Sequence, residues 1–408
     1  MRLAVELYGT IVGTLEGDAR SFDFTPSAAG IDAFGVNSTI LSVAIPFVPA
    51  QPRHHARRRR NWFTELLPEG DQYDYLLSQG GLRRGDTPGF LARYGRDVAG
   101  ALQVWDRDDP TEPRSPRLRA LSDADVRQLL EDPIGSPLAN AASRGRSSLG
   151  GVQPKILVAK TPTGWAQALD GYPTTHILKP RLAPPRETVI FDEEYGSRLA
   201  RAIGLANFET RIMEFAGLPT LVIERYDRVD GQRVHQEDFS QALGASGNEK
   251  YQEFGGVVSL KRIAELLTAH APAGELRTLA RMVVFAVAIG NLDLHSKNLG
   301  LLHPKHGDLR LAPTYDAVPQ AHGSNDGKLA LSVNGKYRFD QIARDDLHSE
   351  FTSWGMRNAR TVIMETLDAL KQTVVVEEPL DGAFATLDDH IAVFIDNLLD
   401  GRPPTGRR

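Results

Sequence analysis

The segment Gly290-Asn291-Leu292-Asp293-Leu294-His295-Ser296-Lys297-Asn298-Leu299 is the most informative stretch of the chain. It follows an apolar run with helical spacing and precedes a short strand-like run, so it is expected to be a loop that begins where a helix ends. Asp293 can orient a hydroxyl nucleophile and accept its proton, and the amide oxygen of Asn298 can bind a magnesium ion. This pair of side chains indicates phosphoryl transfer.

A second acidic position follows this loop. Asp316 lies in the short segment Ala312-Pro313-Thr314-Tyr315-Asp316-Ala317, eighteen residues after Asn298. Magnesium takes one or two ligands from protein and the rest from phosphates and water, so Asn298 and Asp316 would suffice. Each residue alone has an ordinary explanation as a helix cap or turn residue. The order of the two motifs, with the Asp-to-Asn spacing of protein-kinase catalytic loops, favours a site.

Upstream, a glycine-containing segment lies directly before a predicted strand. Successive backbone N–H groups around glycines can cradle phosphate, which makes Gly150, Gly151, Val152 and Gln153 candidate nucleotide contacts together with Lys155. The spacing of a Walker loop is missing, and a Gly-Gly pair is ordinarily a turn, so this signal is weak by itself.

Lys179 ends the predicted strand Ile177-Leu178-Lys179, where its ammonium can bind phosphates as a point charge. In protein kinases a helix glutamate holds such a lysine in place. We expect Glu194 in the following helix to be that partner, and Glu193 would serve equally well on local grounds.

Two further segments are candidates by position. Glu224, Arg225 and Tyr226 close the next predicted strand pair and would lie at a hinge between lobes, where backbone groups often meet adenine. The polar stretch His235-Gln236-Glu237-Asp238-Phe239-Ser240-Gln241 is either a helix start with Asp238 near the cap or a segment that shapes the site.

Composition limits the possible classes of protein. The chain has 408 residues, 41% hydrophobic content and a formal net charge of -5, which suit a folded protein and disfavour one that coats nucleic acid with its whole surface. It contains no cysteine, no apparent signal peptide and no apolar run long enough for a membrane span. A cytoplasmic protein is expected. One basic run, residues 53–60, is either a solvated loop or a contact for an anionic partner.

The periodicity along the chain predicts an α+β fold in three parts. Strands and then helices form a small N-terminal α+β module, a sheet-rich lobe follows a connector, and the last part is mostly helical. The expected boundaries are 1–106 for the N-terminal module, 107–146 for a helical connector, 147–257 for the sheet-rich nucleotide-binding lobe, 258–400 for the helical lobe with the catalytic and metal-binding loops, and 401–408 for a flexible tail.

Together these segments resemble the HipA family of bacterial toxin kinases, whose two-lobed fold is similar to protein kinases and closer to phosphoinositide kinases. The resemblance covers almost the whole chain and rests on five ordered matches: residues 66–70, 95–102 and 148–155, the HQEDFSQALG stretch, and the DLHSKN loop with Thr314-Tyr315-Asp316.

The resemblance implies roles residue by residue. Asp293 would be the catalytic base, Asn298 and Asp316 would bind Mg²⁺, and Lys179 would bind the phosphates of ATP. The nucleotide site would further include 224–226 for adenine, and His295 and Lys297. Ser148 matches an autophosphorylated serine, with Ser147 as the second choice. Pro154 departs from the family pattern and removes one backbone N–H from the phosphate loop.

The resemblance also implies partners and leaves alternatives open. A small helix-turn-helix antitoxin, HipB-like, would bind this chain and operator DNA, so that DNA is contacted only indirectly, and the phosphorylated target would be a translation protein such as an aminoacyl-tRNA synthetase. One alternative is a kinase acting on a small molecule or lipid. Another is a decayed kinase that acts as a corepressor with its antitoxin.

Overall fold

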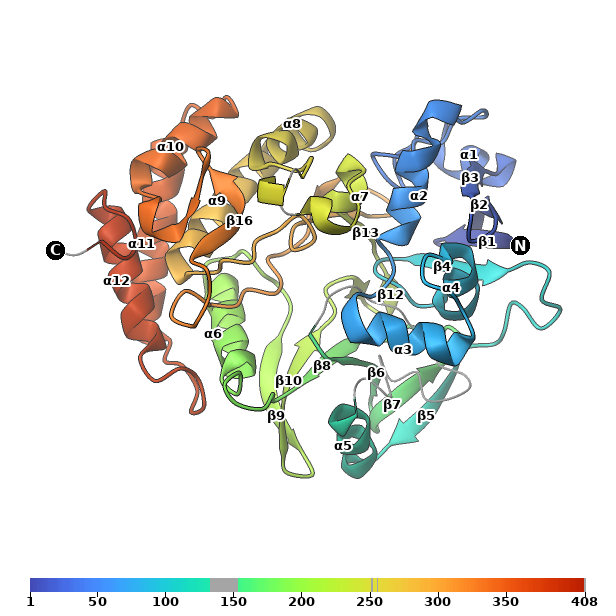
Figure 1. Cartoon of the computed structure of the whole chain (residues 1–408), viewed down its shortest axis with the longest axis horizontal. Helices are drawn as coiled ribbons and strands as arrows, with labels where there is room; N and C mark the ends of the chain where they lie inside the picture. Colours follow the sequence, from blue (N-terminus) through green and yellow to red (C-terminus); the bar gives the residue numbers. More distant parts are fainter. Residues whose placement is uncertain (133–152, 251, 255, 407–408) are drawn as a thin grey trace.

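The computed structural model describes residues 1–132, 153–250, 252–254 and 256–406 of the chain. The N-terminal module lies at one end of the molecule, the helical lobe lies at the other, and a large antiparallel sheet lies below and between them (Figure 1). Most of the predicted phosphate loop falls outside the described residues, and so do both candidate phosphorylated serines, Ser147 and Ser148.

The N-terminal module is a four-stranded antiparallel sheet covered by helices. The sheet has the order β3-β2-β1-β4. Its strands are β1 (Arg2–Leu7), β2 (Thr10–Gly17), β3 (Phe22–Pro26) and β4 (Leu102–Asp106), and the helices are α1 (Ala28–Phe34), α2 (Ala56–Thr64), α3 (Gly70–Gly80) and α4 (Thr87–Tyr94). Phe24, Trp62, Phe63 and Phe90 lie fully buried in its core. The alternating apolar residues near the N-terminus therefore form strands, as predicted.

The basic run is not a loop. It forms a short 3₁₀ turn, Arg53–His55, and the first half of α2. Arg59 has a side chain only 2% exposed and binds both carboxylate oxygens of Asp23, at 2.6 and 2.7 Å. Arg58 donates to the carbonyl of Ala242, whereas Arg57 is exposed. Helical geometry turns successive residues by about 100°, so four adjacent arginines cannot all face solvent.

The sheet-rich lobe is a six-stranded antiparallel sheet with the order β5-β7-β6-β8-β10-β9. Its elements are β5 (Arg117–Leu121), α5 (Asp123–Glu131), β6 (Ile156–Thr161), β7 (Gly164–Leu169), β8 (His176–Pro180), α6 (Val189–Ala202), β9 (Thr210–Phe215) and β10 (Leu218–Glu224). Along β10 the side chain of Leu221 packs with α6, and that of Val222 lies in the cluster that contains α5 residues. Because neighbouring strand residues face opposite ways, the two helices cover opposite faces of the sheet.

One prediction about this lobe needs correction. The connector expected to be helical contributes the edge strand β5 as well as α5, and β5 is missed because its Arg-Leu-Arg-Ala-Leu sequence is mostly exposed. The strands around Leu157 and Ile177 are neighbours in the sheet, although β7 lies between them in the chain. A capping box of Ser122 and Asp125 begins α5, with the Ser122 hydroxyl accepting from the Asp125 N–H.

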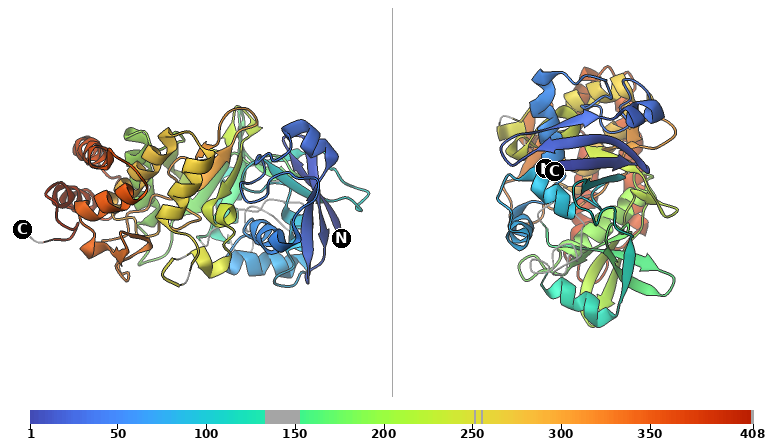
Figure 2. Two further views of the ribbon diagram at one scale, coloured as in Figure 1. Left: turned by 90° about the horizontal axis from the view of Figure 1, so that it is seen from above. Right: turned by 90° about the vertical axis from the view of Figure 1, so that its right-hand side faces the viewer.

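The helical lobe surrounds α9, whose second half is almost entirely buried. Helices α8, α11 and α12 pack against α9, and α10 packs against α11 (Figures 1 and 2). Its elements, with the small hairpin that leads into it, are β11 (Arg228–Val229), β12 (Gln232–Arg233), β13 (His235–Asp238), α7 (Phe239–Leu243), α8 (Leu260–His270), α9 (Gly274–Ile289), β14 (Gly300–His303), β15 (Arg310–Leu311), β16 (Lys328–Val333), β17 (Lys336–Arg338), α10 (Arg344–Ser353), α11 (Ala359–Val376) and α12 (Leu387–Leu399), with 3₁₀ turns at Gly247–Lys250, Gln252–Phe254 and Phe339–Gln341. Across the described residues, we find no helix with the length and apolar character of a membrane span.

Candidate active site

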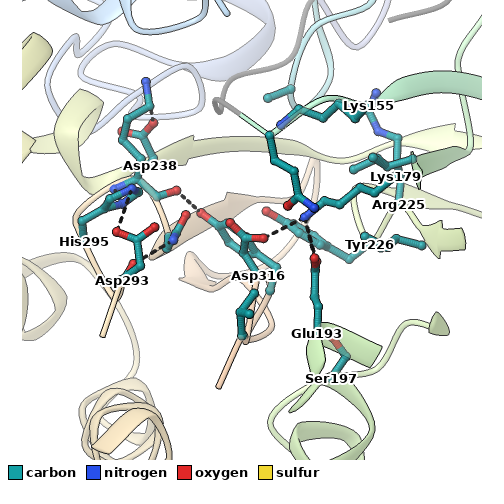
Figure 3. Close-up of a pocket in the computed structure, with 18 of the residues that line it drawn as sticks. Lys155, Lys179, Glu193, Ser197, Arg225, Tyr226, Asp238, Asp293, His295 and Asp316 are labelled. Atoms are coloured by element: carbon teal, nitrogen blue, oxygen red, sulfur yellow. Dashed lines mark hydrogen bonds and ion pairs between the residues drawn. The ribbon is translucent and has the colours of Figure 1, made fainter. Parts of the chain in front are cut away.

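A cavity of about 490 Å³ lies where the three parts of the chain meet. Its lining includes Lys155 and Lys179 from the sheet-rich lobe, Asp293 and Asp316 from the helical lobe, and Glu65 from the N-terminal module. Figure 3 shows Lys155, Lys179 and Glu193 on one side, Asp238, Asp293 and His295 on the other, and Asp316 between them. Polar groups from distant segments therefore converge on one space, which is typical of an active site.

Lys179 is the centre of a buried charge cluster. Its ammonium lies 2.7 and 2.9 Å from the two carboxylate oxygens of Glu193 on α6, and 2.8 Å from Oδ1 of Asp316. Strand β8 supplies the lysine, which is 5% exposed. One ammonium thus bridges the sheet, the helix beside it and the loop that follows β15.

The two carboxylates respond differently to this lysine. Burial raises the pKa of Glu193 to about 7, more than Lys179 lowers it. Burial alone would also raise the pKa of Asp316, but Lys179 and its hydrogen bond lower it to about 2. Asp316 is therefore the carboxylate that stays ionised at neutral pH, as a cation ligand must.

The expected lysine partner Glu194 is wrong. Glu194 pairs instead with Arg198, with the carboxylate 3.2 Å from the guanidinium one helical turn further on. Adjacent helix residues point about 100° apart, so only one of two neighbouring glutamates can face Lys179. The local alternative, Glu193, is the partner that the structure brings to the lysine.

The catalytic-loop candidates are held by their own loop. Helix α9 ends at Gly290, with φ 70°, and the Asn291 side chain accepts from the Asp293 N–H at 3.0 Å. The Asn298 amide nitrogen donates to the Asp293 carbonyl at 2.8 Å, which keeps its carbonyl oxygen available as a ligand. The Asp293 side chain is 43% exposed at the cavity and lies 3.9 Å from the His295 ring.

Close backbone packing brings the Asp316 segment to α6. A Cβ atom added at Gly196 would lie 1.9 Å from the carbonyl oxygen of Ala317, so only glycine allows this approach. Asp316 itself has a positive φ of 55°, which is uncommon for a residue with a side chain. Strained backbone of this kind collects at functional sites.

The hinge residues line the cavity, but their side chains differ from the adenine-binding expectation. Tyr226 stacks on Tyr315 and packs against Phe208. The Arg225 guanidinium is buried and bonded to Asp227, to Thr174 and to the carbonyl of Val98. A nucleotide contact from Arg225 is therefore left to its backbone. Glu224 also lines the cavity, at the end of β10.

The ammonium of Lys297 is paired with carboxylates of the N-terminal module. The ammonium lies 2.8 Å from Oε2 of Glu65 and 3.3 Å from Glu69, both in the N-terminal module. Its expected role in nucleotide binding stays a prediction, because Lys297 lines the cavity while its ammonium is paired with the buried side chain of Glu65 and the partly exposed one of Glu69. His295, 8% exposed, remains at the cavity wall with Gln153 and Lys155.

Lys179 lies close enough to Lys155 to lower the pKa of Lys155. Burial lowers the pKa of Lys155 to about 8, with a further contribution from Lys179, while Asp316 and Glu193 oppose the change. The two ammonium groups can bind phosphate oxygens, while Glu193 and Asp316 beside them balance their charge.

Several lining residues were not predicted as part of the site. These are Glu65 and Glu69, which lie far from the catalytic loop in the sequence, and Ser197 on α6. Gln236, Asp238 and Gln241 also line the cavity, and they belong to the polar stretch that was expected either to start a helix or to shape the site. Asp238 caps α7, as one of the two interpretations expected, in a capping box with Gln241, and it also lines the cavity. Both interpretations of the polar stretch therefore apply to Asp238.

The sheet lobe, the helical lobe and the charge cluster between them define a two-lobed, protein-kinase-like fold with a strand lysine held by a helix glutamate. Comparison with known proteins identifies the family within this class. The family model of the HipA N-terminal domain matches residues 3–105, and that of the HipA-like C-terminal domain matches residues 147–374. The chain belongs to the HipA family.

Individual relatives agree with this assignment. The protein Y4mE of Sinorhizobium fredii, which is named as a kinase, is 32% identical over 402 residues, covering 95% of this chain and 92% of its own length. The serine/threonine-protein kinase toxin HipA of Shewanella oneidensis is 25% identical over 369 residues, covering 85% and 84%. The solved structure of HipA with HipB and operator DNA from that organism has a TM-score of 0.78 at 24% identity, covering 98% of this chain and 99% of that one.

Proposed function

We propose that this protein is an ATP-dependent serine/threonine protein kinase, the toxin of a toxin–antitoxin pair. The observation that carries the proposal is the ammonium of Lys179 held between Glu193 and Asp316, at 2.7 and 2.8 Å, in a cavity shared with Asp293 and Asn298. These are the groups that phosphoryl transfer from ATP requires.

The residues have separate tasks in this proposal. Lys179 and Lys155 bind the phosphates, and the cavity near Tyr226 receives the adenine. Asp293 orients the substrate hydroxyl and takes its proton while the new O–P bond forms and the bond from the γ-phosphorus to ADP breaks. Asn298 and Asp316 offer two oxygen ligands to Mg²⁺, which when bound neutralises charge on the phosphates.

The finer parts of the proposal come from family membership. The antitoxin would be a HipB-like helix-turn-helix protein, because the solved relative was crystallised with HipB and operator DNA. The target would be a translation protein such as an aminoacyl-tRNA synthetase, and phosphorylation of it would arrest growth. Ser148, or Ser147 beside it, would be autophosphorylated.

One incubation tests the activity and separates the alternatives. Purified protein, a bacterial lysate, Mg²⁺ and ATP labelled at the γ-phosphate are combined, and Asp293→Asn serves as the matched control. Label on a serine or threonine of a lysate protein, absent from the control, supports the proposal. Label only on a small molecule or lipid would favour that kinase class, and no labelled product with tight antitoxin binding would favour the corepressor.

The basic run now supports only a reduced DNA contact. Since Arg59 is buried against Asp23, Arg53 and Arg57 are the exposed arginines that could approach phosphates beside a bound antitoxin. Replacing both with alanine should lower the salt dependence of the ternary complex by up to about 1.8 in the logarithmic slope. Arg360→Ala, exposed on α11, is the control. An unchanged slope would remove this contact.

A further inference from the structure

Lys297 joins the catalytic loop to the N-terminal module. Its ammonium lies 2.8 Å from Oε2 of Glu65, 3.2 Å from the backbone carbonyl of Glu65 and 3.3 Å from Oε1 of Glu69. The side chains of Lys297 and Glu65 are 9% and 7% exposed. Their pairing is therefore a buried contact between segments 232 residues apart, not a surface ion pair.

Glu65 uses both carboxylate oxygens in this contact. Oε1 accepts from the N–H of Gly247 at 2.9 Å while Oε2 binds Lys297. Asp238 adds a third carboxylate, 3.9 Å from the same ammonium. A buried carboxylate with two donors has a defined position, because any rotation would leave a buried charge without its partner.

The backbone of Lys297 reaches the other side of the site. Its carbonyl oxygen accepts from the Tyr315 hydroxyl at 2.7 Å, and Tyr315 directly precedes Asp316. Asn298 directly follows Lys297. A displacement of Lys297 would therefore move both proposed magnesium ligands, Asn298 through the chain and Asp316 through the tyrosine.

The module has another anchor that does not depend on this pair. Glu237 on β13 is fully buried and accepts from the Ser42 hydroxyl at 2.6 Å, the Val43 N–H at 2.9 Å and the Trp62 ring nitrogen at 2.8 Å. A ring nitrogen of His303 on β14 also lies 3.0 Å from Oε1 of Glu237. Loss of the Glu65–Lys297 pair would therefore leave the module docked, so docking and positioning can be tested separately.

We infer that Glu65 and Lys297 are positioning residues through which the N-terminal module sets the arrangement of the two magnesium ligands. The inference rests on the proposed function, because a magnesium site is expected here only if the protein binds Mg²⁺ with ATP. The module is thus a working part of the active site, and anything that moves α2 would change the metal requirement of the reaction.

The test measures the binding of ADP to the full chain by calorimetry over a series of Mg²⁺ concentrations. Glu65→Gln and Lys297→Met should each raise the Mg²⁺ concentration for half-maximal binding about tenfold, and the double variant should be no worse than either, because the residues act as one unit. ADP affinity without metal should stay within about twofold. Lys297→Arg, which keeps the charge, should recover most of the effect.

Controls separate positioning from folding. Lys371→Met and Asp396→Asn remove an exposed pair of the helical lobe, 2.7 Å apart, and should leave Mg²⁺ dependence unchanged. Hydrogen exchange of the amides of residues 292–299, measured without nucleotide, should be faster in Lys297→Met than in the wild type.

The outcomes distinguish the inference from the proposed function. Wild-type Mg²⁺ dependence and wild-type exchange in folded Glu65→Gln and Lys297→Met would overturn the inference, and so would additive effects in the double variant. A wild-type protein that binds Mg²⁺ and ADP yet transfers no phosphate would remove the proposed function, while the binding data would still decide the inference.

Discussion

Replacement of Glu193 by glutamine should lower the rate of phosphoryl transfer far more than the same replacement of its neighbour Glu194 on α6. Glu193 is 1% exposed, and both its oxygens bind the Lys179 ammonium. A buried charge left without any partner costs about 3–5 kcal/mol, but Asp316 still lies 2.8 Å from this ammonium. We therefore expect the loss of a charge-assisted hydrogen bond, about 2–3 kcal/mol.

We expect this lost hydrogen bond to raise the free energy of the transition state for phosphoryl transfer. In the variant the Lys179 ammonium would keep an ion pair with Asp316 alone, and Asp316 is also a proposed ligand of Mg²⁺. A change of about 2–3 kcal/mol corresponds to about a 30- to 150-fold lower kcat/KM. The assay is initial-rate transfer of labelled phosphate from ATP to the protein substrate, with thermal unfolding to check that the variant is folded.

Glu194→Gln is the matched control on the same helix. It removes only the pair with Arg198, whose guanidinium side chain is 21% exposed. Partly exposed pairs are worth about 1 kcal/mol or less, so kcat/KM should stay within about fivefold of the wild type. Equal losses in the two variants, or a near-normal rate in Glu193→Gln, would refute the assignment of Glu193 to Lys179.

The other predictions concern the same cavity. Asp293→Asn should lower phosphoryl transfer by about 10²- to 10⁴-fold and keep ATP affinity within a few fold in calorimetry, whereas near-normal turnover would contradict its role as base. Asp316→Ala should weaken Mg²⁺-ATP binding as well as the rate, and unchanged affinity would make Asp316 a structural residue. Burial raises the pKa of Asp238 to about 7 against the opposing effect of Lys297. The folded state therefore holds a proton between about pH 4 and 7 that the unfolded chain releases, so stability falls as pH rises through that window. Asp238→Asn keeps a good helix cap and should remove this fall in urea unfolding curves, while a parallel pH profile would argue against the raised pKa. Ser148 should gain phosphate from ATP, and phosphate found only on Ser147 in mass spectra would shift the assignment by one residue.

The catalytic segments could be predicted because their chemistry is local. The loop from Asp293 to Asn298 follows a helix and carries its functional groups at a fixed spacing, and the structure places both at one cavity with Asp316. Lys179 was also predicted from a local pattern, a lysine near the end of a strand, and the structure places it at the same cavity. The choice between Glu193 and Glu194 was not local, because it depends on the rotation of α6 against the sheet.

Burial of polar residues was harder to predict. A run of basic residues usually covers a solvated face, yet Arg59 lies inside the N-terminal module with Asp23, 36 residues away. In the same way Lys297 meets Glu65 from the other end of the sequence. Pairings of this kind follow from the docking of whole elements, and periodicity along one segment contains no information about them.

The polar stretch from His235 to Asp238 shows what periodicity can still explain once the fold is known. It forms β13, so alternate side chains face opposite ways. His235, through a ring nitrogen 2.8 Å from the Leu41 carbonyl, and Glu237, through its bonds to Ser42 and Trp62, hold the N-terminal module. Gln236 and Asp238 line the cavity, and Glu237 reaches it as well.

This one strand therefore joins the module to the active site, and Glu237 contacts both. The segment after it continues the connection, since the Phe239 N–H lies within bonding distance of the carbonyls of Ser296 and Leu299 and the Ser240 hydroxyl bonds to that of Ser296, at 2.7 Å. Without the module, the buried carboxylate of Glu237 would keep only His303 among its four donors. An uncompensated buried charge costs several kcal/mol, a large share of the stability of a typical domain. The catalytic loop and the N-terminal module are thus parts of one folded unit, and the chemistry of the cavity depends on both.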